Sequence, residues 1–209
     1  MNFPFIGFFS SKMEFMEIDA FLAQRIRELR KSNGFTLETL AEQSGVSRSM
    51  ISLIERQETS PTAAVLNKLA DAFGVSLPTL FSGNGEAAPD PLNKQAQQPV
   101  WTDPASGYVR RHLSPSAMAL PFELVEVTFP AGETVVFESP LRKLGIHQQI
   151  WVLQGAMEIT LGNESWHLAT GDCLAIELSA RITFHNPTPK PARYVLAVTS
   201  PDSLSRRLS

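Results

Sequence analysis

The sequence predicts a protein of two domains, a bundle of five short helices at residues 17–82 followed by a β-barrel at residues 101–209. In the first region apolar residues recur at three- and four-residue spacing, as in helices with one buried face. In the second, short apolar runs are separated by turn sequences roughly every ten residues, which is typical of sandwiches and barrels. Residues 83–100 are rich in proline, glycine and polar residues, so we expect a flexible linker there.

Length and composition agree with two small domains. The chain has 209 residues, 43% of them hydrophobic, and a formal net charge of −3. This near-neutral charge excludes proteins that coat nucleic acid by bulk charge, so any DNA binding must come from a local patch. The single cysteine, Cys173, excludes an intrachain disulfide and cysteine-rich zinc sites. It favours a reducing compartment, and we predict a cytoplasmic protein.

Residues 1–16 are expected to be disordered, or to result from an overextended start codon with Met13 or Met16 as alternatives. The apolar run at residues 3–9 is too short to span a bilayer. Lys12 follows this run, whereas a secretory signal has its basic residues before the apolar core. We therefore expect no membrane partner.

The helical region carries helix starts and stops at regular places. Thr36 is expected to cap the second helix and Ser47 the third, because a hydroxyl oxygen can accept a hydrogen bond from a free backbone N–H of the first turn. Residues 60–62 open the fourth helix, and Gly74 ends it. Residues 77–81 are expected to form a short fifth helix.

The segment at residues 36–56 predicts two helices joined by a tight turn. Gly45 lies in the turn and tolerates the positive φ that such a turn requires. The third helix starts with small polar residues around Arg48, which let a backbone approach the DNA major groove while Arg48 reaches guanine O6 and N7. The alternative is a helical bundle with no role in nucleic-acid binding.

Residues 26–81 resemble the helix-turn-helix domain of the phage-repressor and Cro class, also called the XRE class. The resemblance is carried by the segments at residues 40–56 and 60–81. It implies binding to an operator in double-stranded DNA as a homodimer, on half-sites about one helical turn apart. Leu37 stands where the family often has glutamine, so the resemblance does not carry over the contact usually made there. The implied DNA-contacting residues are Thr36, Gln43, Ser47, Arg48, Ser49, Ser52 and Arg56.

The β region resembles the cupin family, most clearly over residues 145–198. Residues 153–155 and 171–172 stand where cupins place turns between strands, and Asn186 stands where the second cupin motif has asparagine. The resemblance implies a barrel of the double-stranded β-helix type.

Metal-binding cupins hold their ion with three histidines and a glutamate. Because none of the corresponding side chains is a metal ligand, we expect neither a metal cofactor nor cupin oxygenase or isomerase chemistry. By strand alternation His147 and His185 point away from the barrel interior, and a relocated metal site at the histidines is the alternative. The corresponding positions are Arg142, Leu144, Gln148 and Ile182.

A metal-free barrel can still hold a small molecule. Its predicted interior is apolar with a few polar groups, which is typical of a ligand pocket, but the same residues could fill a closed core that serves only dimerisation. Arg110 or Arg111 is a candidate for contacting an anionic ligand or the partner subunit. The predicted pocket residues are Arg142, Gln148, Ile150, Val152, Ile182 and Phe184.

Together these features predict a dimeric transcriptional regulator without enzymatic activity. Repression is favoured because the resembled family leans that way, and the β domain is expected to sense a small effector, to dimerise, or both. Two alternatives remain open: a cupin enzyme that its helical domain tethers to DNA, and an antitoxin-like protein that binds a partner chain.

Overall fold

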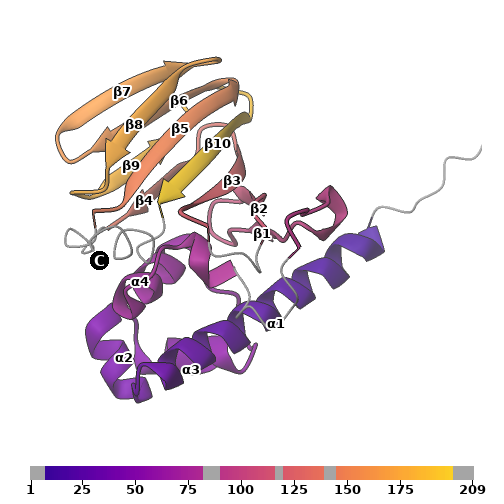
Figure 1. Ribbon diagram of the computed structural model, residues 1–209, viewed down its shortest axis with the longest axis vertical. Helices are drawn as coiled ribbons and strands as arrows, with labels where there is room; N and C mark the ends of the chain where they lie inside the picture. Colours follow the sequence, from indigo (N-terminus) through magenta and orange to yellow (C-terminus); the bar gives the residue numbers. More distant parts are fainter. Residues whose placement is uncertain (1–7, 82–89, 116–119, 139–144, 200–209) are drawn as a thin grey trace, which may run out of the picture.

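The computed structural model describes residues 8–81, 90–115, 120–138 and 145–199, with side chains from Ile18 onward. A helical domain is followed by a β domain, as predicted, and the two lie directly against each other (Figure 1). None of the helices in these described ranges combines the length and the apolar character that a membrane crossing needs.

The helical domain contains four α-helices in its described part, not the five predicted. Residues 78–81 form a 3₁₀ turn, η1, in which Thr79 N donates to Ser76 O and Leu80 N to Leu77 O. This three-residue spacing suits a segment that is too short for an α-helical turn and that begins at proline, which has no N–H to donate. The elements are α1 (Phe8–Ser32), α2 (Leu37–Ser44), α3 (Arg48–Glu55), α4 (Ala63–Phe73) and η1 (Pro78–Phe81).

Helix α1 begins at Phe8, within the segment that was expected to be disordered. Extending a helix that is already nucleated adds one hydrogen bond for each residue ordered, which favours continuation of the helix toward the N-terminus. Residues 1–7 lie outside the described ranges.

The predicted helix caps are confirmed. Thr36 Oγ1 accepts from Thr39 N at 3.1 Å, and Ser47 Oγ accepts from Met50 N at 3.2 Å. Gly74 follows α4 in the left-handed conformation, with a φ of 70°. The apolar faces meet in one core, in which the most deeply buried side chains include Leu22, Ile26, Leu40, Ile51, Ile54, Leu66 and Leu69.

The β domain consists of two antiparallel sheets. One has the strand order β1-β2-β3-β10-β5-β8 and the other β4-β9-β6-β7. Among the described strands no pairing joins the two sheets, so the predicted barrel is a two-layer sandwich in this structure. The strands are β1 (Val100–Thr102), β2 (Val109–His112), β3 (Phe122–Phe129), β4 (Thr134–Phe137), β5 (His147–Gln154), β6 (Ala156–Leu161), β7 (Glu164–Ala169), β8 (Cys173–Glu177), β9 (Ile182–His185) and β10 (Ala192–Thr199).

Alternating residues of the strands form the sandwich core. Val125 and Val127 of β3 lie beside Leu196 and Tyr194 of β10, and all four are buried. The buried Asn186 donates to the carbonyls of Pro130 at 3.0 Å and Lys190 at 2.8 Å, and to that of Phe129 at 3.3 Å. It thereby fixes two turns to each other, a structural role for the residue that carried part of the cupin resemblance.

The two domains make specific contacts. Asp103 Oδ1 accepts from Ala63 N at 3.0 Å, which ties the start of α4 to the β domain. The Phe81 ring stacks on His112 with 4.4 Å between ring centroids, and it lies 5.8 Å from Trp101. One of these contacts is a buried hydrogen bond and the others join buried rings. The two domains therefore pack against each other through a buried interface and are not joined by a linker alone.

The predicted linker is partly ordered against the β domain. Asn93 Nδ2 lies 3.1 Å from the carbonyl of Ser114 and 3.2 Å from that of Leu113, and residues 95–97 form a second 3₁₀ turn. Hydrogen bonds from polar side chains to neighbouring backbone carbonyls hold this segment in position. Burial of apolar side chains contributes little here. Residues 82–89 lie outside the described ranges.

Candidate functional site

The start of α3 is presented on the surface while its inner side is anchored. Ile51 and Ile54 are fully buried in the helical core. Arg48 and Ser49, at the start of the helix, are exposed, and the Arg48 side chain is 65% exposed. Figure 1 shows α2 and α3 at the end of the helical domain that faces away from the β sandwich. The described part of the β domain therefore does not cover this helix start.

A buried ion pair fixes α3 to α1. The Glu55 side chain, only 6% exposed, accepts from Arg30 Nε at 2.6 Å and from Arg30 Nη2 at 2.8 Å. Arg27 Nη2 donates to the Glu55 carbonyl at 2.5 Å. Because Glu55 ends α3, these bonds set the direction of the helix relative to the long helix α1.

The two exposed arginines of the predicted DNA contacts have acidic partners. Arg48 Nε lies 2.5 Å from Glu38 Oε1, and Arg56 Nε lies 2.7 Å from Glu58 Oε1. Exposed pairs of this kind contribute about 0–1 kcal/mol, so exchanging the carboxylate for a DNA group costs little. Sequence reasoning missed Glu38. This residue follows Leu37, whose side chain packs against the core.

The remaining predicted contacts are exposed or half-buried. Thr36, Gln43 and Ser47 are exposed, and Ser52 is half-buried and accepts from Arg56 Nη1 at 3.1 Å. Thr36 and Ser47 also serve as helix caps, so their hydroxyl oxygens have a structural role as well. Sequence reasoning missed Met50, an exposed apolar side chain on α3 that could contact a thymine methyl group.

The predicted pocket residues separate into two groups. Gln148, Ile182 and Phe184 line a cavity between the sandwich and the helical domain, whereas Ile150 and Val152 are fully buried in the sandwich core and are not among its lining residues. Arg142 lies outside the described residues. The separation arises because the cavity is at one end of the sandwich and not along its centre.

Two side chains of α4, Asn67 and Asp71, also line this cavity. Sequence reasoning missed them because they belong to the other domain. Asn67 Nδ2 donates to the Glu138 carbonyl at 2.8 Å and to Asp71 Oδ2 at 3.2 Å. The cavity is therefore shared between the domains.

The residues at the cupin metal positions do not fit a metal ion. Gln148 and Ile182 offer neither an imidazole nor a carboxylate. Over the described ranges no three His, Cys, Asp or Glu side chains gather as they would around an ion. His147 is exposed, and His185 Nδ1 lies 2.9 Å from Thr134 Oγ1.

Asp71 gives the protein a pH-dependent stability that an asparagine would remove. Burial raises the pKa of the Asp71 carboxyl to about 7 from its usual 3.8. The folded state thus holds this proton more tightly than the unfolded state, and the free energy of unfolding falls as pH rises from about 4 to about 7. We expect Asp71→Asn to match the wild type near pH 4 and to exceed it by about 1 kcal/mol at pH 8, allowing for solvent screening. Urea unfolding at several pH values measures this, and a constant difference across the range would contradict it.

Comparison with known proteins agrees with the helical geometry. Residues 26–80 match the family model described as HTH_3, helix-turn-helix. The HTH-type transcriptional regulator SutR of Escherichia coli strain K12 is 30% identical over 163 residues, which cover 78% of this chain and 84% of that protein. The chain belongs to the HTH_3 family of transcriptional regulators.

Similarity to other helix-turn-helix regulators extends over most of the chain. PuuR of Escherichia coli strain K12, also an HTH-type transcriptional regulator, is 27% identical over 180 residues, 84% of this chain and 93% of that protein. The crystal structure of an HTH_3 family regulator from Vibrio cholerae superposes with a TM-score of 0.71 and 25% identity, covering 88% of this chain and 97% of that one.

Proposed function

We propose that this HTH_3 regulator binds an operator in double-stranded DNA with the start of α3 in the major groove, and that it represses transcription there. One observation carries the proposal: Arg48 and Ser49 are exposed at the start of a helix whose opposite side is anchored by Ile51 and Ile54. A helix held in this way can place an arginine against guanine O6 and N7 without moving the domain core.

The active form is a homodimer. Helix α3 has eight residues, so one copy offers few side chains to base edges. Two copies related by two-fold symmetry double these contacts on a palindromic operator. In this proposal the β domain holds the two copies together and thereby sets the distance between the two α3 helices.

The β domain is a metal-free cupin-type sensor without enzymatic activity, acting in the cytoplasm. Gln148 and Ile182 stand at two of the metal-ligand positions and cannot replace the missing donors. The relatives that cover both domains carry the name of transcriptional regulators. A small effector in the cavity beside α4 would change operator binding only if it had different affinities for the DNA-bound and free arrangements.

Selection of bound fragments from a random-sequence DNA library tests the proposal. The wild-type protein should enrich a palindromic motif whose half-site centres lie roughly 10–10.5 base pairs apart. Enrichment of no motif, or of a single unrepeated half-site, would contradict dimeric operator recognition.

A further inference from the structure

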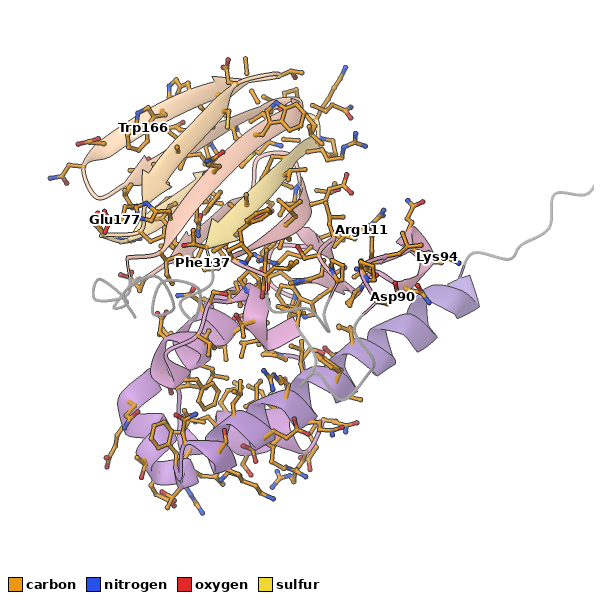
Figure 2. The ribbon with its side chains drawn as sticks, viewed as in Figure 1. Asp90, Lys94, Arg111, Phe137, Trp166 and Glu177 are labelled. Carbon is orange, nitrogen blue, oxygen red and sulfur yellow. The ribbon has the colours of Figure 1, made fainter. Side chains whose placement is uncertain are left out.

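A cavity lies at the junction of the two domains, bounded by the end of the sandwich and by α4 with the segment that leads to η1. Its lining is mainly apolar with a few polar side chains, which is the usual composition of a small-molecule site. Phe129, Ile182, Phe184 and Leu196 supply apolar walls. Figure 2 shows Phe137, another lining residue, at the end of the sandwich that faces the helices.

A buried arginine faces this cavity, and none of the described carboxylates forms an ion pair with it. Arg110, on β2, is only 4% exposed, and it lines the cavity. Its Nε and Nη2 have no hydrogen-bond partner among the described residues. Burying a guanidinium group is costly unless an acceptor satisfies its N–H groups, so this position is suited to an anion that enters from outside.

The neighbouring acidic side chains of the described residues form no ion pair with Arg110. Asp103 uses its oxygens to accept from Ala63 N, Ala105 N, and the N–H and hydroxyl of Ser106. Asp71 lines the same cavity from α4, but it does not pair with Arg110 Nε or Nη2, which have no partner among the described residues. Because the pKa of Asp71 is raised to about 7, its charge is partly neutralised near neutral pH, and the lining favours negative charge.

Two further polar groups of the lining lack partners within the described part of the chain. They are the Tyr108 hydroxyl, which lies near Arg110 without meeting hydrogen-bond geometry, and Gln148 Oε1. Burial raises the pKa of Tyr108, so its hydroxyl stays protonated and can donate. A guanidinium beside a phenol is a suitable donor set for a carboxylate, while the aromatic walls suit an apolar body.

We propose that this cavity binds a small organic carboxylate, with its anionic group on Arg110 and Tyr108 and its body against Phe129 and Phe184, and that α4 contacts the same ligand through Asn67. The proposal rests on the sensor role proposed above and specifies the chemical class of the effector. Since α4 belongs to the DNA-binding domain, occupancy of the cavity acts directly on the contact between the domains.

Titration calorimetry of the full-length protein without DNA tests the ligand class. The probes are acetate, isovalerate and benzoate, each compared with its neutral amide. At least one carboxylate should bind saturably, with an affinity about tenfold or more above that of its amide. Saturable binding by none of the three, or equal binding of acid and amide, would overturn the proposal.

Two variants separate a binding role of Arg110 from a structural one. Arg110→Met should weaken carboxylate binding by about tenfold or more, while the variant melts at the wild-type temperature or above because an unpaired buried charge is removed. Arg111→Met is the matched control. Arg111 is half-buried and lies to the side of the domain in Figure 2. Its Nη1 lies 3.9 Å from Glu126 Oε2. It should leave the affinity within about twofold of wild type. Unchanged binding in Arg110→Met would overturn the assignment.

Nuclear magnetic resonance tests the contact with α4. The side-chain amide signal of Asn67 should shift during the carboxylate titration and saturate with the calorimetric affinity. If only signals of the β domain move, the contribution of α4 is wrong. Because no DNA is present, these results are independent of the library selection, and either proposal can fail alone.

Discussion

Replacing Arg30 with methionine is expected to lower the free energy of unfolding by about 3–5 kcal/mol. Arg30 makes two hydrogen bonds to the carboxylate of Glu55, whose side chain is 6% exposed. Without Arg30 this buried carboxylate keeps its desolvation cost and loses its closest positive partner. Since Glu55 ends α3, the variant should also bind DNA more weakly under conditions in which it remains folded.

Arg27→Met is the matched control, because Arg27 lies on the same helix and contacts the same glutamate but has a side chain that is 46% exposed. It should cost roughly 1 kcal/mol. The double variant Arg30→Met, Glu55→Leu should recover much of the loss, because an apolar pair can replace a buried ion pair at little cost. Urea unfolding measures all three variants. An Arg30→Met effect no larger than that of Arg27→Met would show that the pair does not fix α3.

Arg48→Ala should weaken binding to the selected operator by about 1–3 kcal/mol, or roughly 5- to 150-fold. The side chain is exposed at the start of α3 and makes no buried contact, so its loss should leave the fold unchanged. Gel-shift titration at fixed salt measures the affinity, and a melting curve checks the fold.

Glu38→Gln provides the control for Arg48. It removes the carboxylate that lies 2.5 Å from Arg48 Nε and keeps the arginine. The affinity for the operator should stay equal or rise, because a negative charge near the DNA phosphates is removed. A loss of affinity in Glu38→Gln as large as that in Arg48→Ala would mean that the ion pair itself, and not the arginine, is required.

Local chemistry made much of the helical domain predictable. The caps at Thr36 and Ser47 depend on a hydroxyl and a backbone N–H three residues later, and the end at Gly74 depends on the freedom of glycine at positive φ. The inward positions Ile51 and Ile54 follow from helical periodicity. Such signals span only a few residues, so a single sequence contains them.

Features that depend on tertiary contact were not predictable. Periodicity cannot distinguish a 3₁₀ turn from a short helix at residues 78–81, and strand spacing cannot distinguish a sandwich from a barrel. The cavity joins Asn67 of α4 to Arg110 of β2, residues that sequence reasoning placed in separate domains. Arg110 was named as a candidate for an anionic ligand, but its burial without a partner is visible only in three dimensions.

Protection of operator guanines from dimethyl sulfate, which methylates N7 in the major groove, tests the central claim most directly. If the start of α3 lies against base edges, the wild-type protein should protect at least one guanine N7 in each half-site. The Arg48→Ala variant, at concentrations that saturate the operator, should leave that guanine reactive. Equal protection by both proteins, or protection by neither, would contradict the placement of α3 in the major groove.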